Sequence, residues 1–399
     1  MFQGRAAVYK LNATSNEFVH VDSIEVTDTA GQDSTVSNRS GEAVAISADS
    51  TTIVVGEPRW DLNENNTKFG RVHVYARDDT TMLYSSSELG INHTLYATDT
   101  ANNYLGRAVA SNANGSVVAV GAPGYNSGLG VSLVYELNEY GVYEIVTVIE
   151  GTSTSHNFGR SVWLSSDGLT MAVGAYKNNN LGYVRLYVRN GTDYEMKVEI
   201  DHPNDEGFGR SVVITPSASH IAVGDPNFNT SRGLAAVYSF DGESVTQIGS
   251  DLKSDVENSN FGRSVALTSN AKYLIVGAAG DDLSTNGTVH VFRFDAYASD
   301  WVEVLDQKTG DLSGDDFGDW FGASLAVTPN RHTLVVGATQ NAYATSTERI
   351  GYAKMLTCSC YENERVLDAS CVPCPADATH ASGMHSAMSY VINSRRNKC

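Results

Sequence analysis

The sequence has little that would place it in a membrane or on nucleic acid. No uninterrupted apolar run among its 399 residues approaches the roughly 18 that a membrane-spanning helix needs. Lys and Arg number 27 against 46 Asp and Glu, a formal net charge of −19. Because nucleic acid and anionic membranes repel so acidic a chain, neither is an expected partner. The opening residues MFQGRAAVYK lack the basic and apolar regions of a signal peptide, so a secreted form would need a signal upstream.

Sequence motifs of catalysis are missing as well. The ten histidines are scattered, with no H-x-H or H-E-x-x-H pairing for a metal. No G-x-S-x-G elbow and no phosphate-binding Gly-Lys-Ser/Thr loop occurs. These absences predict that the protein is not an enzyme, although an active site assembled from single loop residues would leave no motif. The 36 glycines and only 8 prolines, with 41% hydrophobic residues, suit a turn-rich all-β protein.

The sequence is rich in internal repeats. The stretch NFGRSVWLSSDGLTMAVGA, residues 157–175, returns as NFGRSVALTSNAKYLIVGA, residues 260–278. A glycine that opens an apolar run is followed fifteen residues later by a second glycine in six copies: Gly41/Gly56, Gly106/Gly121, Gly159/Gly174, Gly209/Gly224, Gly262/Gly277 and Gly322/Gly337. A third glycine then precedes an aromatic residue by five positions, at Gly70, Gly130, Gly182, Gly233 and Gly287, more weakly at Gly351, and once more at Gly4. Such a fixed period is typical of repeat architectures.

Each copy predicts four antiparallel strands. Segments such as SVWL, MAVG and YVRLY are rich in β-branched and aromatic residues, and short turns such as SSDG and SNANG separate them. Because one such meander cannot bury both of its faces, the copies must stack as the blades of a β-propeller. Seven copies of the third strand against six of the first pair predict seven blades over residues 1–357, repeats starting near 41, 106, 159, 209, 262 and 322, with the first (1–25) and last blades incomplete in this chain.

The repeat resembles a known family. Phe-Gly at 158–159, 208–209, 261–262 and 321–322, with Val-Gly-Ala or Val-Gly-Asp at 173–175, 223–225 and 336–338 and Val-Gly-Ala-Pro at 120–123, is similar to the FG-GAP repeat of the integrin α-subunit propeller. That family carries calcium loops between the first two strands of some copies. Here those turns hold one acidic residue at most, such as Asp49 or Asp167, so plain hairpin turns are expected instead.

All five cysteines follow residue 357 and define a second region, residues 358–399. Two close pairs, Cys358/Cys360 and Cys371/Cys374, have a spacing that suits a four-thiolate zinc site. The stretch CVPCPADATHASG instead resembles extracellular cysteine-rich modules of the ephrin-receptor and TNF-receptor-like type, which implies that these four cysteines form disulfides. The odd total, ending on Cys399, then suggests a module that is cut short.

Possible glycan acceptors agree with an extracellular or cell-surface location. Eight asparagines precede x-Ser/Thr: Asn12, Asn38, Asn65, Asn92, Asn114, Asn190, Asn229 and Asn286. Any membrane anchor would lie outside this chain, because the fragment has no membrane span.

Two groups of charged residues are candidate binding sites. Arg107, Arg160, Arg210 and Arg263 each follow the first glycine of a repeat, so blade symmetry predicts an arc of guanidinium groups that would bind a carboxylate, sulfate or phosphate. Structural pairing with neighbouring blades is the alternative, and Glu42 and Ala323 interrupt the arc. The loop at 310–322 gathers Asp311, Asp315, Asp316 and Asp319, which would suit Ca²⁺ if they are not simply solvated surface. No other cofactor is expected.

The sequence therefore predicts a non-catalytic extracellular or cell-surface propeller that mediates adhesion, or binds a protein or glycan ligand, through its loops. One alternative is a structural spacer within a larger secreted or wall-associated protein. Another is the accessory propeller of a secreted hydrolase whose chemistry lies elsewhere.

Overall fold

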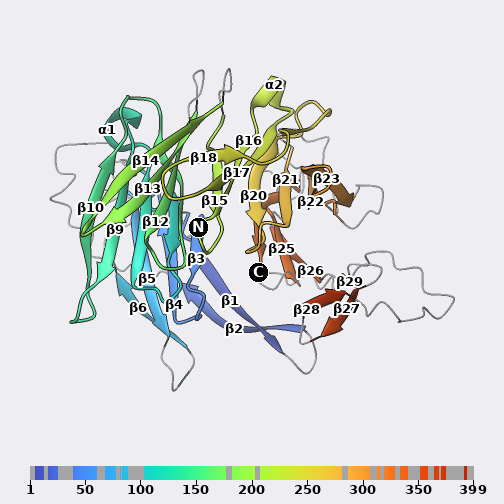
Figure 1. Ribbon diagram of the computed structural model, residues 1–399. Helices are drawn as coiled ribbons and strands as arrows, with labels where there is room; N and C mark the ends of the chain where they lie inside the picture. Colours follow the sequence, from blue (N-terminus) through green and yellow to red (C-terminus); the bar gives the residue numbers. More distant parts are fainter. Residues whose placement is uncertain are drawn as a thin grey trace, which may run out of the picture. The chain divides into compact units, whose positions relative to one another are not determined.

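A computed structural model of the chain shows an all-β protein whose small antiparallel sheets are arranged as a β-propeller (Figure 1). The residues that the structure describes are 5–12, 17–25, 39–60, 68–77, 81, 83–88, 103–176, 182–202, 207–280, 286–305, 312–314, 319–328, 333–339, 351–357, 364–367, 370–373 and 391–392. The chain divides into two compact units, residues 1–223 with 238–246 and residues 224–237 with 247–399. We describe each unit by itself.

The first unit contains three complete blades. Blade 1 has the order β3 (Ala43–Ile46), β4 (Thr52–Glu57), β5 (Arg71–Arg77), β6 (Tyr84–Glu88). Blade 2 has β7 (Ala108–Ser111), β8 (Val117–Ala122), β9 (Val131–Leu137), β10 (Tyr143–Glu150). Blade 3 has β11 (Phe158–Leu164), β12 (Thr170–Ala175), β13 (Tyr183–Asn190), β14 (Asp193–Asp201). In each blade the strands pair in chain order, as the repeat predicts.

The remaining blades follow the same pattern. Blade 4, through whose sequence the division between the units runs, has β15 (Ser211–Ile214), β16 (His220–Asp225), β17 (Leu234–Phe240), β18 (Val245–Gln247), with β19 (Leu252–Lys253) also on β17. Blade 5 has β20 (Phe261–Leu267), β21 (Tyr273–Ala278), β22 (Thr288–Asp295), β23 (Asp300–Leu305). Blade 6 has β24 (Phe321–Val327), β25 (Thr333–Ala338), β26 (Tyr352–Thr357), β29 (Val391–Ile392).

The propeller prediction is confirmed, but the blade count differs. Among the described residues six sheets are blades, not seven. The expected seventh is present only as a two-stranded ribbon of β1 (Arg5–Asn12) and β2 (Glu17–Glu25), because these strands pair with each other alone. The last blade, predicted to stop after three strands, gains β29 beside β26. Strands β27 (Glu364–Leu367) and β28 (Ser370–Pro373) form a separate hairpin.

Helix is almost absent from the described residues. Two four-residue turns, α1 (Tyr125–Gly128) and α2 (Phe228–Ser231), follow β8 and β16, and each contains two consecutive residues with left-handed backbone angles. No helix in the described part of the chain is long and apolar enough to span a membrane.

Repeat glycines in most blades fit one blade against the next. A Cβ atom on Gly121 of blade 2 would lie 2.0 Å from the carbonyl oxygen of Gly159 in blade 3. A Cβ on Gly130 would lie 2.1 Å from the carbonyl oxygen of Phe158. The first glycine of every repeat has a left-handed backbone, φ between 84° and 89°, which side chains disfavour. The sequence repeats itself because each blade needs glycine at these close contacts.

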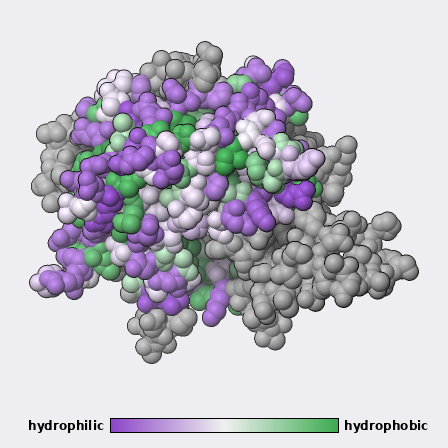
Figure 2. Space-filling model, in the orientation of Figure 1, coloured by the Kyte–Doolittle hydropathy of each residue, from purple (hydrophilic) through white to green (hydrophobic). Residues whose placement is uncertain are grey.

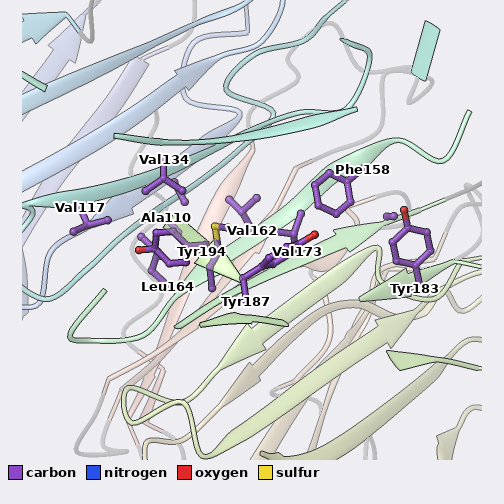
Figure 3. Close-up of a cluster of buried hydrophobic side chains, with 13 residues drawn as sticks. Ala110, Val117, Val134, Phe158, Val162, Leu164, Val173, Tyr183, Tyr187 and Tyr194 are labelled. Carbon is purple, nitrogen blue, oxygen red and sulfur yellow. The ribbon is translucent and has the colours of Figure 1, made fainter. Parts of the chain in front are cut away.

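Apolar residues between adjacent blades form the core. Figure 3 shows the cluster between blades 2 and 3, where Phe158 and Tyr183 lie toward one end. Phe158 and Val162 come from β11, Val173 from β12, and Tyr183 and Tyr187 from β13. A matching cluster joins blades 1 and 2, and another joins blades 5 and 6. Hydrophilic and hydrophobic residues are interspersed on the outer face that Figure 2 shows.

The turns between the first two strands are plain hairpins, as predicted. In blade 3 the Ser165 hydroxyl donates to Asp167 Oδ1 and accepts a hydrogen bond from the Thr170 amide at 2.9 Å. Ser47, Asp49 and Thr52 of blade 1 repeat this arrangement. The acidic oxygens of these turns therefore satisfy hairpin donors.

Candidate functional site

The start of blade 1 departs from the repeat at three positions. The residue before the first glycine is a fully buried phenylalanine in four blades, Phe158, Phe208, Phe261 and Phe321, but Ser40 in blade 1. The residue after that glycine is arginine in four blades but Glu42 here. The residue after the second glycine is alanine in four blades but Glu57 here. Because breaks in a local rule concentrate at functional sites, blade 1 is where a site is expected.

Glu42 lies between two arginines. Its Oε1 is 3.3 Å from Arg107 Nη1 of blade 2, and its Oε2 is 3.4 Å from Arg39 Nη1. The side chains of Glu42, Arg107 and Arg39 have relative exposures of 19%, 27% and 46%, so all three are partly exposed. We call these three residues the Glu42 site.

The same tight turn positions the side chain after the first glycine in every blade. The Glu42 amide donates to the Arg39 carbonyl at 3.1 Å, and the Arg107 amide donates to the Tyr104 carbonyl at 3.0 Å. The amides of Arg160, Arg210, Arg263 and Ala323 make the same bond to the carbonyl three residues earlier. The residue two before the glycine is left-handed in most copies, with a φ of 55° at both Arg39 and Tyr104. The turn therefore holds Glu42 and Arg107 at matching places in adjacent blades.

The charges of other arginines act on the pKa of Arg107. Burial lowers the pKa of Arg107, and repulsion from the charges of Arg210, Arg39 and Arg59 lowers it further, while Glu42 opposes the shift. Arg210, from blade 4, packs its guanidinium over the ring of Tyr176 at 5.0 Å. Among the described residues, Glu42 is the carboxylate within ion-pair distance of Arg107.

The predicted arc of arginines is brought together only in part. The charge of Arg210 contributes to the lowered pKa of Arg107. Arg160 occupies the equivalent turn in blade 3. Arg263 belongs to the second unit, where its guanidinium lies 5.4 Å from the centre of the Trp320 ring. Arg39, Arg59 and Glu42 were missed by the sequence reading, which treated Glu42 only as an interruption.

A buried polar row lies beside the Glu42 site. Glu57 Oε2 accepts from Arg71 Nε at 2.5 Å and lies 3.3 Å from His73 Nε2. The Gly41 amide donates to the Gly56 carbonyl at 3.0 Å. In blade 3 the same register pairs Phe158 with Ala175. In blade 1 it therefore places Ser40 opposite Glu57. All four residues are buried, with at most 8% exposure, so substrate does not reach them in this conformation. The row lies across the first strands of blade 1, the first of which begins directly after the turn that carries Glu42.

The Glu42 site has the groups that ester hydrolysis needs. A carboxylate takes a proton from water, and guanidinium groups stabilise negative charge that develops on a carbonyl oxygen. Both stand within ion-pair distance of one another here.

The aspartate loop is described only at one of its four residues. Asp319 is buried, with 1% exposure, and accepts a hydrogen bond from the Tyr352 hydroxyl at 2.7 Å. Asp311, Asp315 and Asp316 lie outside the described residues. Within the described ranges no group of three His, Cys, Asp or Glu is placed to hold a metal. The calcium site stays a prediction.

The sequons and cysteines are placed as follows. Asn114, Asn190 and Asn229 are exposed, whereas Asn286 is partly buried and its Nδ2 donates to the Gly314 carbonyl at 3.0 Å. Asn12 lies in β1. Asn38, Asn65 and Asn92 lie outside the described residues, as do Cys358, Cys360 and Cys374. Cys371 lies in β28. Glycosylation and disulfide formation stay predictions.

Comparison with known proteins gives the fold alone. No family model and no curated protein matches the chain. Three solved structures each match 88% of the chain. A candidate 6-phosphogluconolactonase from Bacteroides fragilis has a TM-score of 0.58, 14% sequence identity and 86% of its own chain covered, and one from Bacteroides uniformis has a TM-score of 0.59, 12% identity and 88% of its own chain covered. A periplasmic gluconolactonase from Pseudomonas aeruginosa has a TM-score of 0.54, 14% identity and 88% of its own chain covered. These identities are too low to transfer an activity.

Two expectations are corrected by this comparison. The sequence predicted a non-catalytic adhesion propeller, with a spacer or an accessory propeller as alternatives, and it predicted no enzyme. Both predictions are contradicted, because the similar propellers bear the names of lactonases, which are enzymes. The prediction rested on missing motifs, and an active site assembled from single residues of several blades would leave no motif in the sequence. None of the three propellers is an integrin-type or cysteine-rich protein by name.

Proposed function

We propose that the chain is a hydrolase that opens a cyclic sugar ester, a lactone, at the Glu42 site. The observation that carries this proposal is Glu42 itself. It is a carboxylate in ion-pair distance of two partly exposed arginines, at a position that four other blades give to arginine. The lactonase names of the similar propellers supply the substrate class.

The chemistry follows from these groups. Glu42 accepts a proton from a water molecule, and the water oxygen attacks the lactone carbonyl carbon. The Arg107 guanidinium donates hydrogen bonds to the carbonyl oxygen as it becomes an oxyanion. The tetrahedral intermediate then collapses, the bond from the carbonyl carbon to the ring oxygen breaks, and protonated Glu42 returns its proton to that oxygen. Arg39 holds the carboxylate of Glu42 in place throughout.

Replacing Glu42 tests this proposal. Glu42→Gln keeps the shape of the side chain but removes the base, so kcat/KM for gluconolactone or 6-phosphogluconolactone should fall by about 10² to 10⁴-fold. The control is Glu243→Gln, an exposed carboxylate that pairs with Lys197 at 2.8 Å and should leave the rate unchanged. Rates are corrected for spontaneous opening of the lactone. Full activity in Glu42→Gln, or none in the wild type on either lactone, would contradict the proposal.

We also propose that the repeat is related to the FG-GAP type and that the protein works outside the cell. The buried phenylalanines and interlocking glycines of the repeat support the first statement. The exposed sequon residues Asn114, Asn190 and Asn229 and the clustering of all cysteines after residue 357 support the second. Secretion from eukaryotic cells with a signal supplied should give a mass that glycosidase lowers, and four cysteines that resist alkylation. A glycan-free chain with five reactive thiols would contradict it.

A further inference from the structure

Blade 5 holds a hydroxyl, an imidazole and a carboxylate in one hydrogen-bonded row. Thr288 and His290 lie two residues apart on β22, so their side chains point to the same face of the strand. The His290 Nε2 atom is 3.3 Å from Thr288 Oγ1, and its Nδ1 atom is 2.7 Å from Glu303 Oε1 on β23. We call these three residues the Thr288 row; all belong to the second unit.

The carboxylate of Glu303 sets the tautomer of the imidazole. An ionised carboxylate only accepts hydrogen bonds, so Nδ1 of neutral His290 carries the proton and donates it to Glu303. Nε2 is then an acceptor that faces the hydroxyl of Thr288. The rings of Phe261 and Phe292 pack against the imidazole, with centroid distances of 5.2 and 6.4 Å, and hold its plane. The row therefore has the order of hydroxyl, base and orienting carboxylate that activates a nucleophile.

Blade 3 shows the same three positions used for structural pairing. Its third glycine is followed by Tyr183 and, two residues later, by Arg185, which pairs with Glu199 at 2.7 Å. The exposures of the two pairs match, with 11% and 41% for Arg185 and Glu199 and 12% and 40% for His290 and Glu303. A guanidinium cannot accept a proton at neutral pH, whereas a neutral imidazole can. Pairing alone needs neither the imidazole nor the hydroxyl of blade 5, so both point to chemistry.

We propose that the Thr288 row is a second hydrolytic site, which transfers the acyl group of an acyclic carboxylic ester to Thr288 and then to water. The Thr288 oxygen attacks the ester carbonyl carbon as His290 Nε2 takes the hydroxyl proton. The bond to the alcohol oxygen then breaks, and that oxygen leaves with the proton from His290. Water attacks the acyl-threonine and gives a proton to His290, which returns it to the Thr288 oxygen as the carboxylic acid departs. This activity goes beyond the lactone opening proposed for Glu42.

The surroundings suit this reaction. Glu303 is exposed, and Thr288 and His290 are partly buried, so the row reaches the surface. Lys354 of blade 6 donates from Nζ to the Ser313 carbonyl at 3.1 Å, and Ser313 pairs with Thr288 in an isolated β-bridge. This positive charge beside the pairing segment favours negative charge on an attacked carbonyl oxygen. An acyclic ester suits a covalent route because its alcohol leaves, whereas the tethered alcohol of a lactone would close the ring again.

Hydrolysis of para-nitrophenyl acetate tests the site, because this activated ester releases a coloured alcohol. The wild type should release it faster than water does, and peptide mass mapping of the quenched protein should find an acetyl group on Thr288. Thr288→Val removes the hydroxyl at constant size and should abolish this acetyl group, whereas Thr288→Ser should retain it. His290→Gln should lower the rate of acetylation by about 10² to 10⁴-fold.

Glu303 is a positioning residue, and its test separates orientation of the imidazole from stability of the blade. Glu303→Gln should lower kcat for the ester by about tenfold or more with KM unchanged, because the imidazole loses the charge that orients it and stabilises its protonated form. The matched control is Glu199→Gln, which removes the equivalent carboxylate of blade 3 and should leave kcat unchanged. Equal kcat values for the two variants would overturn this role.

Glu42→Gln separates the Thr288 row from the site proposed on blade 1. It should lower the rate of lactone opening and leave acetylation of Thr288 unchanged, while His290→Gln should do the reverse. A wild type with no acetyl group on Thr288, or acetylation that His290→Gln leaves unchanged, would overturn this inference without affecting the proposed function. Acetylation of Thr288 with no lactone opening would overturn the proposed function and support the Thr288 row.

Discussion

Blades 1 and 3 share one backbone pattern but carry different side chains at equivalent positions. In blade 3 the row across the first three strands is largely apolar: Phe158, Ala175 and Tyr183, with the Arg185 guanidinium 5.9 Å from the Phe158 ring centre. In blade 1 the equivalent row is Ser40, Glu57, Arg71 and His73. Blade 3 packs this row on blade 2, whereas the apolar part of the blade 1 face packs on Ile24 of the β1–β2 ribbon. The repeat therefore encodes the fold, and the departures from it mark the site.

The largest expected effect comes from the part of the repeat that the two blades share. Gly121→Val would place a Cβ 2.0 Å from the Gly159 carbonyl oxygen, and its three nearest atoms are all backbone, which cannot move aside as a flexible side chain could. We expect a loss of stability above about 4 kcal/mol, enough to prevent folding. Circular dichroism and soluble yield measure it. The control is Gly141→Asn, because Gly141 has no atom near its Cβ position and asparagine tolerates its φ of 76°. A soluble, cooperatively unfolding Gly121→Val variant would contradict the close packing.

The next largest effect is expected from the polar row of blade 1, where Glu57 and Arg71 form a buried ion pair. Glu57→Ala leaves the buried Arg71 without the carboxylate it contacts at 2.5 Å, which should cost about 3–5 kcal/mol. The double variant Glu57→Ala with Arg71→Tyr installs the residues of blade 3, removes the buried charge, and should recover most of that loss. Unfolding midpoints in denaturant compare the two. Equal loss in the single and double variants would show that the row does not act as a pair.

The smallest effect concerns an accessible carboxylate, the counterpart of buried Glu57. Hydrogen bonds from the Ser250 amide and hydroxyl and from the Trp301 amide lower the pKa of Asp300. A lowered folded-state pKa adds stability above the unfolded pKa of about 3.9, and that stability is lost as the pH falls through the folded value. Asp300→Asn should therefore be less stable than the wild type at pH 7, and this difference should shrink as the pH falls below about 4.

Thermal unfolding at several pH values measures this difference. Asp193→Asn is the control, since Asp193 is exposed at the β13–β14 turn and makes no side-chain hydrogen bond with the described residues. A stability difference for Asp300→Asn that does not change with pH would contradict the role given to these hydrogen bonds.

Much of the fold could be predicted from the sequence, because each blade repeats the same pattern of strands and turns. The spacing of Gly159 and Gly174 fixes the hairpin, and alternation in stretches such as YVRLY gives the strands. The blade count was not readable, because whether β1 and β2 join a sheet depends on pairing far along the chain. The sequence showed that Glu42 differs from its repeat equivalents, but not that Arg39 and Arg107 stand on either side of it. Position in a repeat predicts where a residue lies, whereas a partner such as Arg107 comes from the adjacent blade.

The most direct test of the central claim is the ratio of kcat/KM between the wild type and Glu42→Gln on a sugar lactone. The account predicts that wild-type protein opens the lactone and that Glu42→Gln loses about 10² to 10⁴-fold of that rate while unfolding at the same temperature. A ratio near one, or a wild type that opens no lactone faster than water does, would show that the departure from the repeat at blade 1 is not an active site.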